Sequence, residues 1–162
     1  MKHKLDKSSV DDIGRLIEYK KRTIFEYAND LSEEEINRIN NYVENEVPKL
    51  LNSYYNIIID NKIVGCLSLT DKDNGILLDE IYIEEEYRNK GIGTEILKKV
   101  LSDNNIVYLW VYKENVKAVS LYKNIGFNII DETDLRYYMK YSKQRKLNAW
   151  MMKKNLKKMN IK

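Results

Sequence analysis

The residues best suited to chemistry form a short glycine-containing segment, RNKGIGT at positions 88–94. An apolar, β-branched stretch at 77–83 predicts a strand before it, and apolar residues at helical spacing over 92–101 predict a helix after it. The first amides of a helix have no internal partner, and the helix dipole adds partial positive charge there. Gly91 and Gly93 carry no Cβ, so a ligand can approach the backbone closely. The segment therefore predicts a site for a pyrophosphate, with a tight turn that binds nothing as the alternative.

Two common phosphate-binding motifs do not fit this segment. A P-loop requires a Lys followed by Ser or Thr after its last glycine, and no such pair follows Gly93. The dinucleotide-binding fingerprint requires a third glycine where this chain has Ile96, and an acidic loop at 84–86 separates the glycines from the strand.

A second motif lies downstream of the glycine segment. An apolar strand that includes LWVY at 109–112 leads into the pattern N-x-x-A-x-x-L-Y-x-x-x-G-F at 115–127. Together with R-x-x-G-x-G at 88–93, this pattern resembles the two signatures of the GNAT superfamily of acyl-CoA-dependent N-acyltransferases. Two signatures in the right order are far more specific than either one alone, and they cover about 77–127.

The resemblance implies acetyl-CoA as the cosubstrate, and the scarcity of His and Cys in the sequence indicates no metal. In this family the strands at 77–83 and 106–111 splay apart, and the acyl-pantetheine arm enters the gap between them. Backbone groups of the first strand would bind the pantetheine amides, and the glycine turn would bind the pyrophosphate. The resemblance implies cofactor contacts at Ile81, Tyr82, Ile83, Arg88, Asn89, Lys90, Gly91, Ile92, Gly93, Thr94, Asn115 and Tyr122.

Transfer to an amine also requires two proton transfers. A primary amine has a pKa of about 10.4 and is mostly protonated at neutral pH, so a carboxylate must remove a proton, directly or through water. Asp79 and Glu80 are the candidates for this base, and strand alternation predicts that they point to opposite faces. We favour Glu80, and Asp79 stays open. The resemblance places Tyr122 at the position of the general acid that protonates the departing thiolate, in direct transfer through a ternary complex.

The acyl acceptor is the least defined part of the prediction. In the family, the first two helices and the final hairpin shape the acceptor pocket. The acidic stretch at 32–46 and the acidic loop at 84–86 favour a cationic acceptor, such as a polyamine, an aminoglycoside or a lysine side chain. A protein N-terminus or a small metabolite amine stays open. The alternative function is a non-catalytic sensor or scaffold that binds acyl-CoA.

The pattern of apolar residues along the chain predicts the element order β-α-α-β-β-β-α-β-α-β-β. The first helix is expected to follow Ser8 or Ser9, with Val10 on its apolar face, and a capping box at 32–35 opens the second. This order predicts an α/β fold: a GNAT-type mixed, mostly antiparallel sheet with splayed central parallel strands and helices on both faces. Residues 1–141 are expected to form a single domain.

The composition narrows the classes of protein and of chemistry. A hydrophobic fraction of 43% with 33% charged residues is ordinary for a soluble globular chain, and no apolar run is long enough to span a membrane. Cys66 is the only cysteine and His3 the only histidine, so the sequence has few of the residues that a disulfide, a metal site or a cysteine–histidine pair requires. Cys66 lies in an apolar strand pattern and is expected to be buried. We expect a cytoplasmic protein.

The C-terminal segment at 142–162 differs from the rest of the chain. It contains eight basic residues and no acidic residue, together with apolar residues at positions that suit a helix. We expect a basic C-terminal helix or tail that packs on the domain or on a second copy in a homodimer. Binding of a nucleic acid, another polyanion or a membrane surface is the less favoured alternative.

Overall fold

The computed structural model describes residues 2–144 of the chain. One seven-stranded sheet organises them, with the strand order β1-β2-β3-β4-β5-β7-β6. Neighbouring strands are antiparallel except for β4 and β5, which run parallel. The strands are β1 (Lys4–Lys7), β2 (Tyr54–Ile59), β3 (Lys62–Lys72), β4 (Gly75–Ile83), β5 (Ile106–Tyr112), β6 (Asn128–Glu132) and β7 (Arg136–Ser142).

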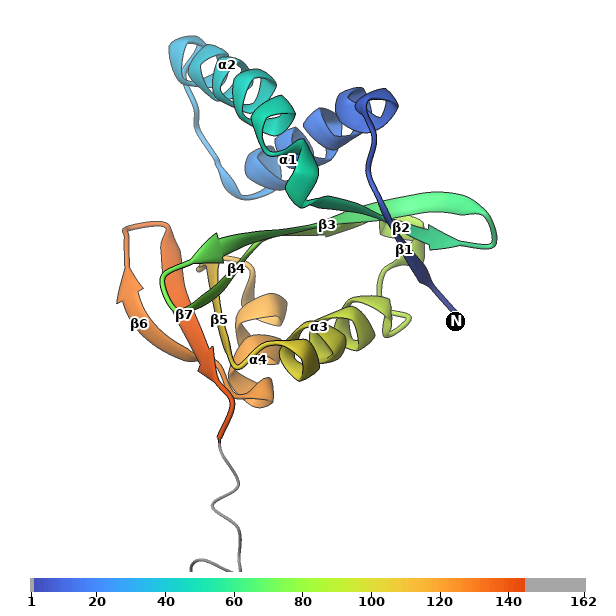
Figure 1. The fold of residues 1–162 in the computed structure, drawn as a ribbon. Helices are drawn as coiled ribbons and strands as arrows, with labels where there is room; N and C mark the ends of the chain where they lie inside the picture. The colour runs from blue at the N-terminus through green and yellow to red at the C-terminus, as the bar shows by residue number, and fades with distance from the viewer. Residues whose placement is uncertain (1, 145–162) are drawn as a thin grey trace, which may run out of the picture.

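Helices cover both faces of this sheet (Figure 1). On one face lie α1 (Ile13–Tyr27) and α2 (Glu33–Lys49), and on the other α3 (Ile92–Asp103) and α4 (Val116–Ile125). Single 3₁₀ turns precede α1, β2 and α3, at Val10–Asp12, Leu51–Ser53 and Glu85–Tyr87. The predicted order of helices and strands and the predicted α/β fold class are confirmed.

Each face of the sheet has its own apolar core. Residues of α3 and α4 pack against one face in the larger core, which includes Ile96, Leu109 and Met139, all essentially inaccessible to solvent. On the other face, Leu16 of α1 and Val43 of α2 pack against strand residues in the smaller core. The smaller core also contains Cys66, which is buried as the sequence predicts, and this burial raises the pKa of its thiol.

The starts of the two N-terminal helices show one correct and one wrong expectation. The capping box of α2 is confirmed, because the Glu35 amide donates to Oγ of Ser32 at 3.2 Å and the Ser32 amide donates to a Glu35 carboxylate oxygen at 2.8 Å. The expectation for Val10 is wrong, because this side chain is 72% exposed. Ser9 precedes a 3₁₀ turn instead of the helix itself, so Val10 lies before α1 and outside its apolar face.

The sheet opens between its two parallel strands. Strand β4 pairs with β5 only from Ile76 to Leu78, and beyond Leu78 it stays with β3 while β5 pairs with β7. A β-bulge lies at this point, since Ser68 of β3 pairs with Glu80 and the next residue of β3 pairs with Leu78. One edge of β4 therefore has no strand beside it over 79–83, which is the splay implied by the family resemblance.

The described chain ends just beyond β7. The strand continues through Ser142, so this first residue of the predicted basic tail belongs to the sheet, and the Lys143 amide donates to the Asn105 carbonyl at 2.7 Å. The rest of the predicted tail, at 145–162, lies outside the described residues. Within residues 2–144, none of the helices has the length and apolar character needed to cross a membrane.

Candidate active site

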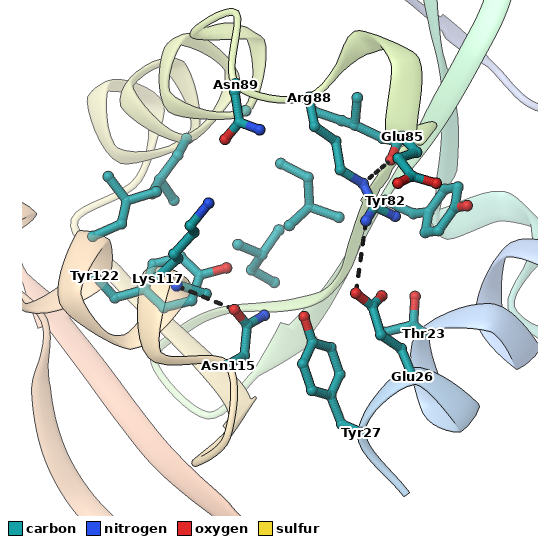
Figure 2. A pocket seen from close by; sticks show the side chains of 17 residues that line it. Thr23, Glu26, Tyr27, Tyr82, Glu85, Arg88, Asn89, Asn115, Lys117 and Tyr122 are labelled. Atoms are coloured by element: carbon teal, nitrogen blue, oxygen red, sulfur yellow. Dashed lines mark hydrogen bonds and ion pairs between the residues drawn. The ribbon is translucent and has the colours of Figure 1, made fainter.

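A cavity of about 490 Å³ opens where β4 separates from β5. Its walls come from α1, β4, the segment at 85–89, the first two turns of α3, and α4 (Figure 2). Elements far apart in the sequence thus meet around one space.

The glycine turn forms the end of this cavity beside α3. Gly91 has a φ of 81°, in the left-handed region that favours glycine, and occupies the N-cap of α3. The first helical hydrogen bond joins the Glu95 amide to the Gly91 carbonyl at 3.0 Å, so the amides before Glu95 have no helical acceptor. A Cβ on Gly93 would stand 3.3 Å from the Ile83 side chain, at the wall of the cavity. The turn therefore offers free amides and little bulk to an anionic ligand.

The basic residues near the turn differ in position. Arg88 lines the cavity, but its Nε donates to the Ile83 carbonyl at 2.7 Å and its guanidinium lies 3.7 Å from a Glu26 carboxylate oxygen (Figure 2). Lys90 lies over the Tyr87 ring and does not line the cavity. Lys117 of α4 does line it, and sequence reasoning missed this residue. The sequence did contain a signal for Lys117, because this residue lies two positions after Asn115, inside the second motif.

The other cofactor positions fall into two groups. The first group lines the cavity and consists of Ile81, Tyr82, Ile83, Asn89, Gly93, Asn115 and Tyr122. Gly91, Ile92 and Thr94 do not line it, and the Ile92 side chain is buried in the core.

Two tyrosines and an asparagine stand at the centre of the site. The Asn115 side chain accepts a hydrogen bond from the Ala118 amide at 3.2 Å, which caps α4 and fixes the side chain beside Tyr122 (Figure 2). Burial, and to a lesser degree Tyr27, raises the pKa of Tyr122 to about 12, so its hydroxyl keeps its proton at neutral pH. Tyr27 comes from α1 and belongs to neither motif, so no pattern in the sequence indicated it.

A second cavity, of about 230 Å³, lies beside the first. The two cavities share several lining residues, among them Thr23, Tyr27, Ile81, Asn115 and Tyr122. Its other walls include Lys20 of α1, Tyr42 of α2, Asp79 and Glu80 of β4, and Arg136 of β7. The two cavities therefore meet at the splay, where a group held in one can reach a group held in the other.

Glu80 is the buried carboxylate of the second cavity. Its side chain belongs to a residue only 7% exposed, and the Tyr54 hydroxyl donates to its Oε2 at 2.9 Å. Its Oε1 is buried without a hydrogen-bond partner. Burial raises the pKa of Glu80 to about 7, against the opposing effects of Lys20 and of the Tyr54 hydrogen bond.

The prediction that Asp79 and Glu80 point to opposite faces is wrong. The bulge breaks the alternation of β4 at this point, and both residues line the second cavity. Asp79 forms an ion pair with Lys20 at 3.6 Å, and both side chains are largely buried. The positive charge of Lys20 also lowers the pKa of Glu80, so one lysine interacts with both carboxylates. Sequence reasoning missed Lys20 and Tyr54, which lie on elements distant from the motifs.

Metal ligands are not gathered within the described part of the chain. Among residues 2–144, no group of three or more His, Cys, Asp or Glu side chains is placed to hold a metal ion.

Comparison with known proteins extends this picture. The sequence profile of the acetyltransferase (GNAT) family matches residues 18–127. An uncharacterized N-acetyltransferase of Bacillus subtilis, YobR, is 42% identical over 79 residues, which are 45% of this chain and 31% of that protein. A spermine/spermidine N(1)-acetyltransferase of the same organism is 32% identical over 71 residues, which are 40% of this chain and 47% of that protein. The chain therefore spans less than half the length of these two relatives.

A solved structure matches over a greater length. The PaiA N-acetyltransferase of Thermoplasma acidophilum, crystallised in complex with coenzyme A, superposes with a TM-score of 0.69 and 25% sequence identity. The match covers 88% of this chain and 99% of that one.

Proposed function

Because the chain belongs to the GNAT family of acetyltransferases, we propose that it transfers an acetyl group from acetyl-CoA to a primary amine. One observation carries this proposal: the two cavities meet at Tyr122, with the buried carboxylate of Glu80 on the wall of the smaller one. The larger cavity would hold acetyl-CoA, and the smaller one would hold the amine.

The larger cavity suits the cosubstrate in both shape and chemistry. The free amides at the start of α3 suit a pyrophosphate, and the Lys117 side chain adds a positive charge on the facing wall. The unpaired edge of β4 over 79–83 offers backbone groups to the amides of a pantetheine arm. Acetyl-CoA supplies the activated acetyl group, and backbone amides of β4 would stabilise negative charge on its carbonyl oxygen.

Glu80 is the proposed general base. A carboxylate with a pKa of about 7 is partly ionised at neutral pH and can take a proton from an ammonium group, directly or through a water molecule. Its unpartnered Oε1 is free to accept that proton, while Tyr54 holds Oε2 in place. Asp79 is the weaker candidate, because it is held in an ion pair with Lys20.

Tyr122 is the proposed general acid. Its hydroxyl donates a proton to the departing sulfur as the carbon–nitrogen bond forms and the carbon–sulfur bond breaks. The second proton that the amine nitrogen loses restores Tyr122, and Glu80 releases the first proton to solvent, so protons balance over the reaction. No protein nucleophile is needed, and Asn115 would orient the chain of the cosubstrate beside Tyr122.

A sensor or scaffold that binds acyl-CoA without turnover is the alternative, and one experiment separates the two. Acetyl-CoA should raise the melting temperature of the chain, because it binds the native state. Incubation with acetyl-CoA and a panel of primary amines should then yield an acetylated amine detectable by mass spectrometry. Binding without any acetylated product would favour the sensor, and the absence of any shift in melting temperature at saturating acetyl-CoA would refute both.

A further inference from the structure

The smaller cavity is not an acidic pocket. Of the acidic stretch at 32–46, all of which the structure describes, only Tyr42 lines this cavity. Glu84 of the acidic loop accepts a hydrogen bond from the Tyr19 hydroxyl at 2.7 Å and is turned toward α1. The negative charge that the sequence offers to a cationic acceptor therefore lies outside the cavity.

The charges that do line the cavity include two cations and two carboxyl groups. Lys20 neutralises Asp79 in the ion pair at 3.6 Å. Glu80 shares its wall and is held partly protonated at neutral pH by its burial. Arg136 then remains as a positive charge at the rim, without an ion pair among the residues that the structure describes.

Arg136 is held in a defined position. It is the first residue of β7, and its guanidinium lies 5.1 Å from the centroid of the Trp110 ring and 5.9 Å from that of Tyr112. Stacking on aromatic faces fixes the plane of a guanidinium and leaves its N–H edge free. That edge matches the two oxygens of a carboxylate.

The two cations of the cavity come from different elements, Lys20 from α1 and Arg136 from β7. Both Arg136 and Lys20 act on Tyr112, where each favours the ionised form of the phenol against the effect of burial on its pKa. Glu80 lies on β4 and Arg136 on β7, and β5 separates these strands in the sheet, so the two residues line different parts of the same cavity of about 230 Å³. An acceptor of modest size could place its amine at one and an anionic group at the other.

We propose that the acceptor is a small amine that also carries a carboxylate, and that Arg136 binds this carboxylate while Glu80 receives the amine. This inference rests on the proposed function and names the class of acceptor for it. It differs from the expectation of a polyamine or aminoglycoside, whose further positive charges would meet Arg136 instead of an acid. Arg136 acts as a specificity-determining residue and takes no part in proton transfer.

A matched pair of amines tests the proposal. Lysine and cadaverine present the same amine on the same carbon chain, and only lysine carries the α-carboxylate; spermidine adds a third, more cationic acceptor. With the full chain and saturating acetyl-CoA, we expect kcat/KM for lysine to exceed that for cadaverine and for spermidine by at least tenfold. Arg136→Gln should lower the value for lysine at least tenfold and should not lower the value for cadaverine.

A control variant on the same strand isolates the effect of position. Lys140 of β7 lies over the Tyr108 ring and lines neither cavity, so Lys140→Gln removes a positive charge without touching the site. This variant should keep the preference for lysine. An equal or greater use of cadaverine or spermidine by the wild-type chain, or an Arg136→Gln loss that is the same for all three amines, would overturn the proposal.

A binding measurement separates failure of this inference from failure of the proposed function. Calorimetric titration of lysine and of cadaverine into the chain saturated with coenzyme A reports the preference even without turnover, and lysine should bind at least tenfold more tightly. If coenzyme A binds but the chain binds lysine no more tightly than cadaverine, only the inference about the carboxylate fails. If coenzyme A itself does not bind, the proposed function fails and this inference fails with it.

Discussion

The Tyr54 hydroxyl donates a hydrogen bond of 2.9 Å to Oε2 of Glu80, and this contact joins β2 to the strand that splays from β5. Tyr54 is itself fully buried, and burial together with the charge of Glu80 raises the pKa of its phenol, so it acts as a fixed donor. Oε1 of Glu80 is buried and has no hydrogen-bond partner, and Glu80 lines the smaller cavity. A buried carboxylate held by one oxygen is well placed to exchange a proton through the other.

The pH dependence of activity should report Glu80. Since its pKa is raised to about 7, kcat/KM should rise with pH up to about pH 7 and bend there, because only the ionised carboxylate can accept a proton. Glu80→Gln should lower kcat/KM at pH 8 by about a hundredfold and remove the bend. Steady-state rates from pH 5.5 to 9 check this, and an unchanged bend in the variant would assign the proton transfer to another group.

The same carboxyl group should make stability depend on pH. Its pKa is about 7 in the folded state and 4.5 in its ordinary state, so the folded chain binds the proton more tightly. The free energy of unfolding of the wild type should therefore fall as pH rises from about 4.5 to 7, by roughly 3 kcal/mol from this group. The Gln side chain in Glu80→Gln cannot lose a proton, so the free energy of unfolding of this variant should rise relative to that of the wild type over the same pH range. Urea unfolding at pH 5 and pH 8 measures the difference, and parallel curves would contradict the raised pKa.

The sequence predicted the site residues that lie within the two motifs. It did not predict the side chains that other helices and strands bring to the site. The turn at Gly91 follows from a local pattern, because a helix start is encoded in a few adjacent residues. The places of Asn115 and Tyr122 at the site follow from the family resemblance. Tyr54 and Lys20 could not be predicted, because their contacts with Glu80 and Asp79 depend on strand register and on how α1 crosses the sheet.

The bulge at Asp79 illustrates the same limit in one strand. Alternation along β4 predicts opposite faces for Asp79 and Glu80, and no residue type at this point signals an extra residue in the strand. The bulge becomes visible only in the pairing of β4 with β3. It places both carboxyl groups in one cavity, which changes the chemistry available there.

Tyr122→Phe should separate catalysis from binding. The variant keeps the ring that packs against Phe127 and loses only the hydroxyl, so the fold and the larger cavity should stay intact. We expect kcat to fall by at least tenfold while the dissociation constant of coenzyme A changes less than threefold. Equal kcat values for variant and wild type would remove Tyr122 from the proton transfer.

The position of Gly93 permits a test of the pyrophosphate site with its own control. Gly93→Ala adds a Cβ that stands 3.3 Å from the Ile83 side chain, and Gly93→Asp adds the same Cβ and a negative charge. An acidic residue in the first turn of α3 is favourable for the helix, so the aspartate variant should fold. Calorimetry should show a loss of coenzyme A affinity of at least tenfold for Gly93→Asp, well beyond that for Gly93→Ala. Similar losses in both variants would indicate a steric effect alone and argue against a phosphate at this turn.

The most direct test of direct acetyl transfer is a rapid-mixing measurement of thiol release from acetyl-CoA, with and without a primary amine. The single thiol of the chain, Cys66, is fully buried, so the released thiol should be that of coenzyme A. Direct transfer from acetyl-CoA to the amine predicts no burst of thiol in the absence of amine and steady, amine-dependent release once lysine is added. A burst of one thiol per chain without amine would reveal an acetylated protein intermediate, and no release with any amine would contradict the proposed activity itself.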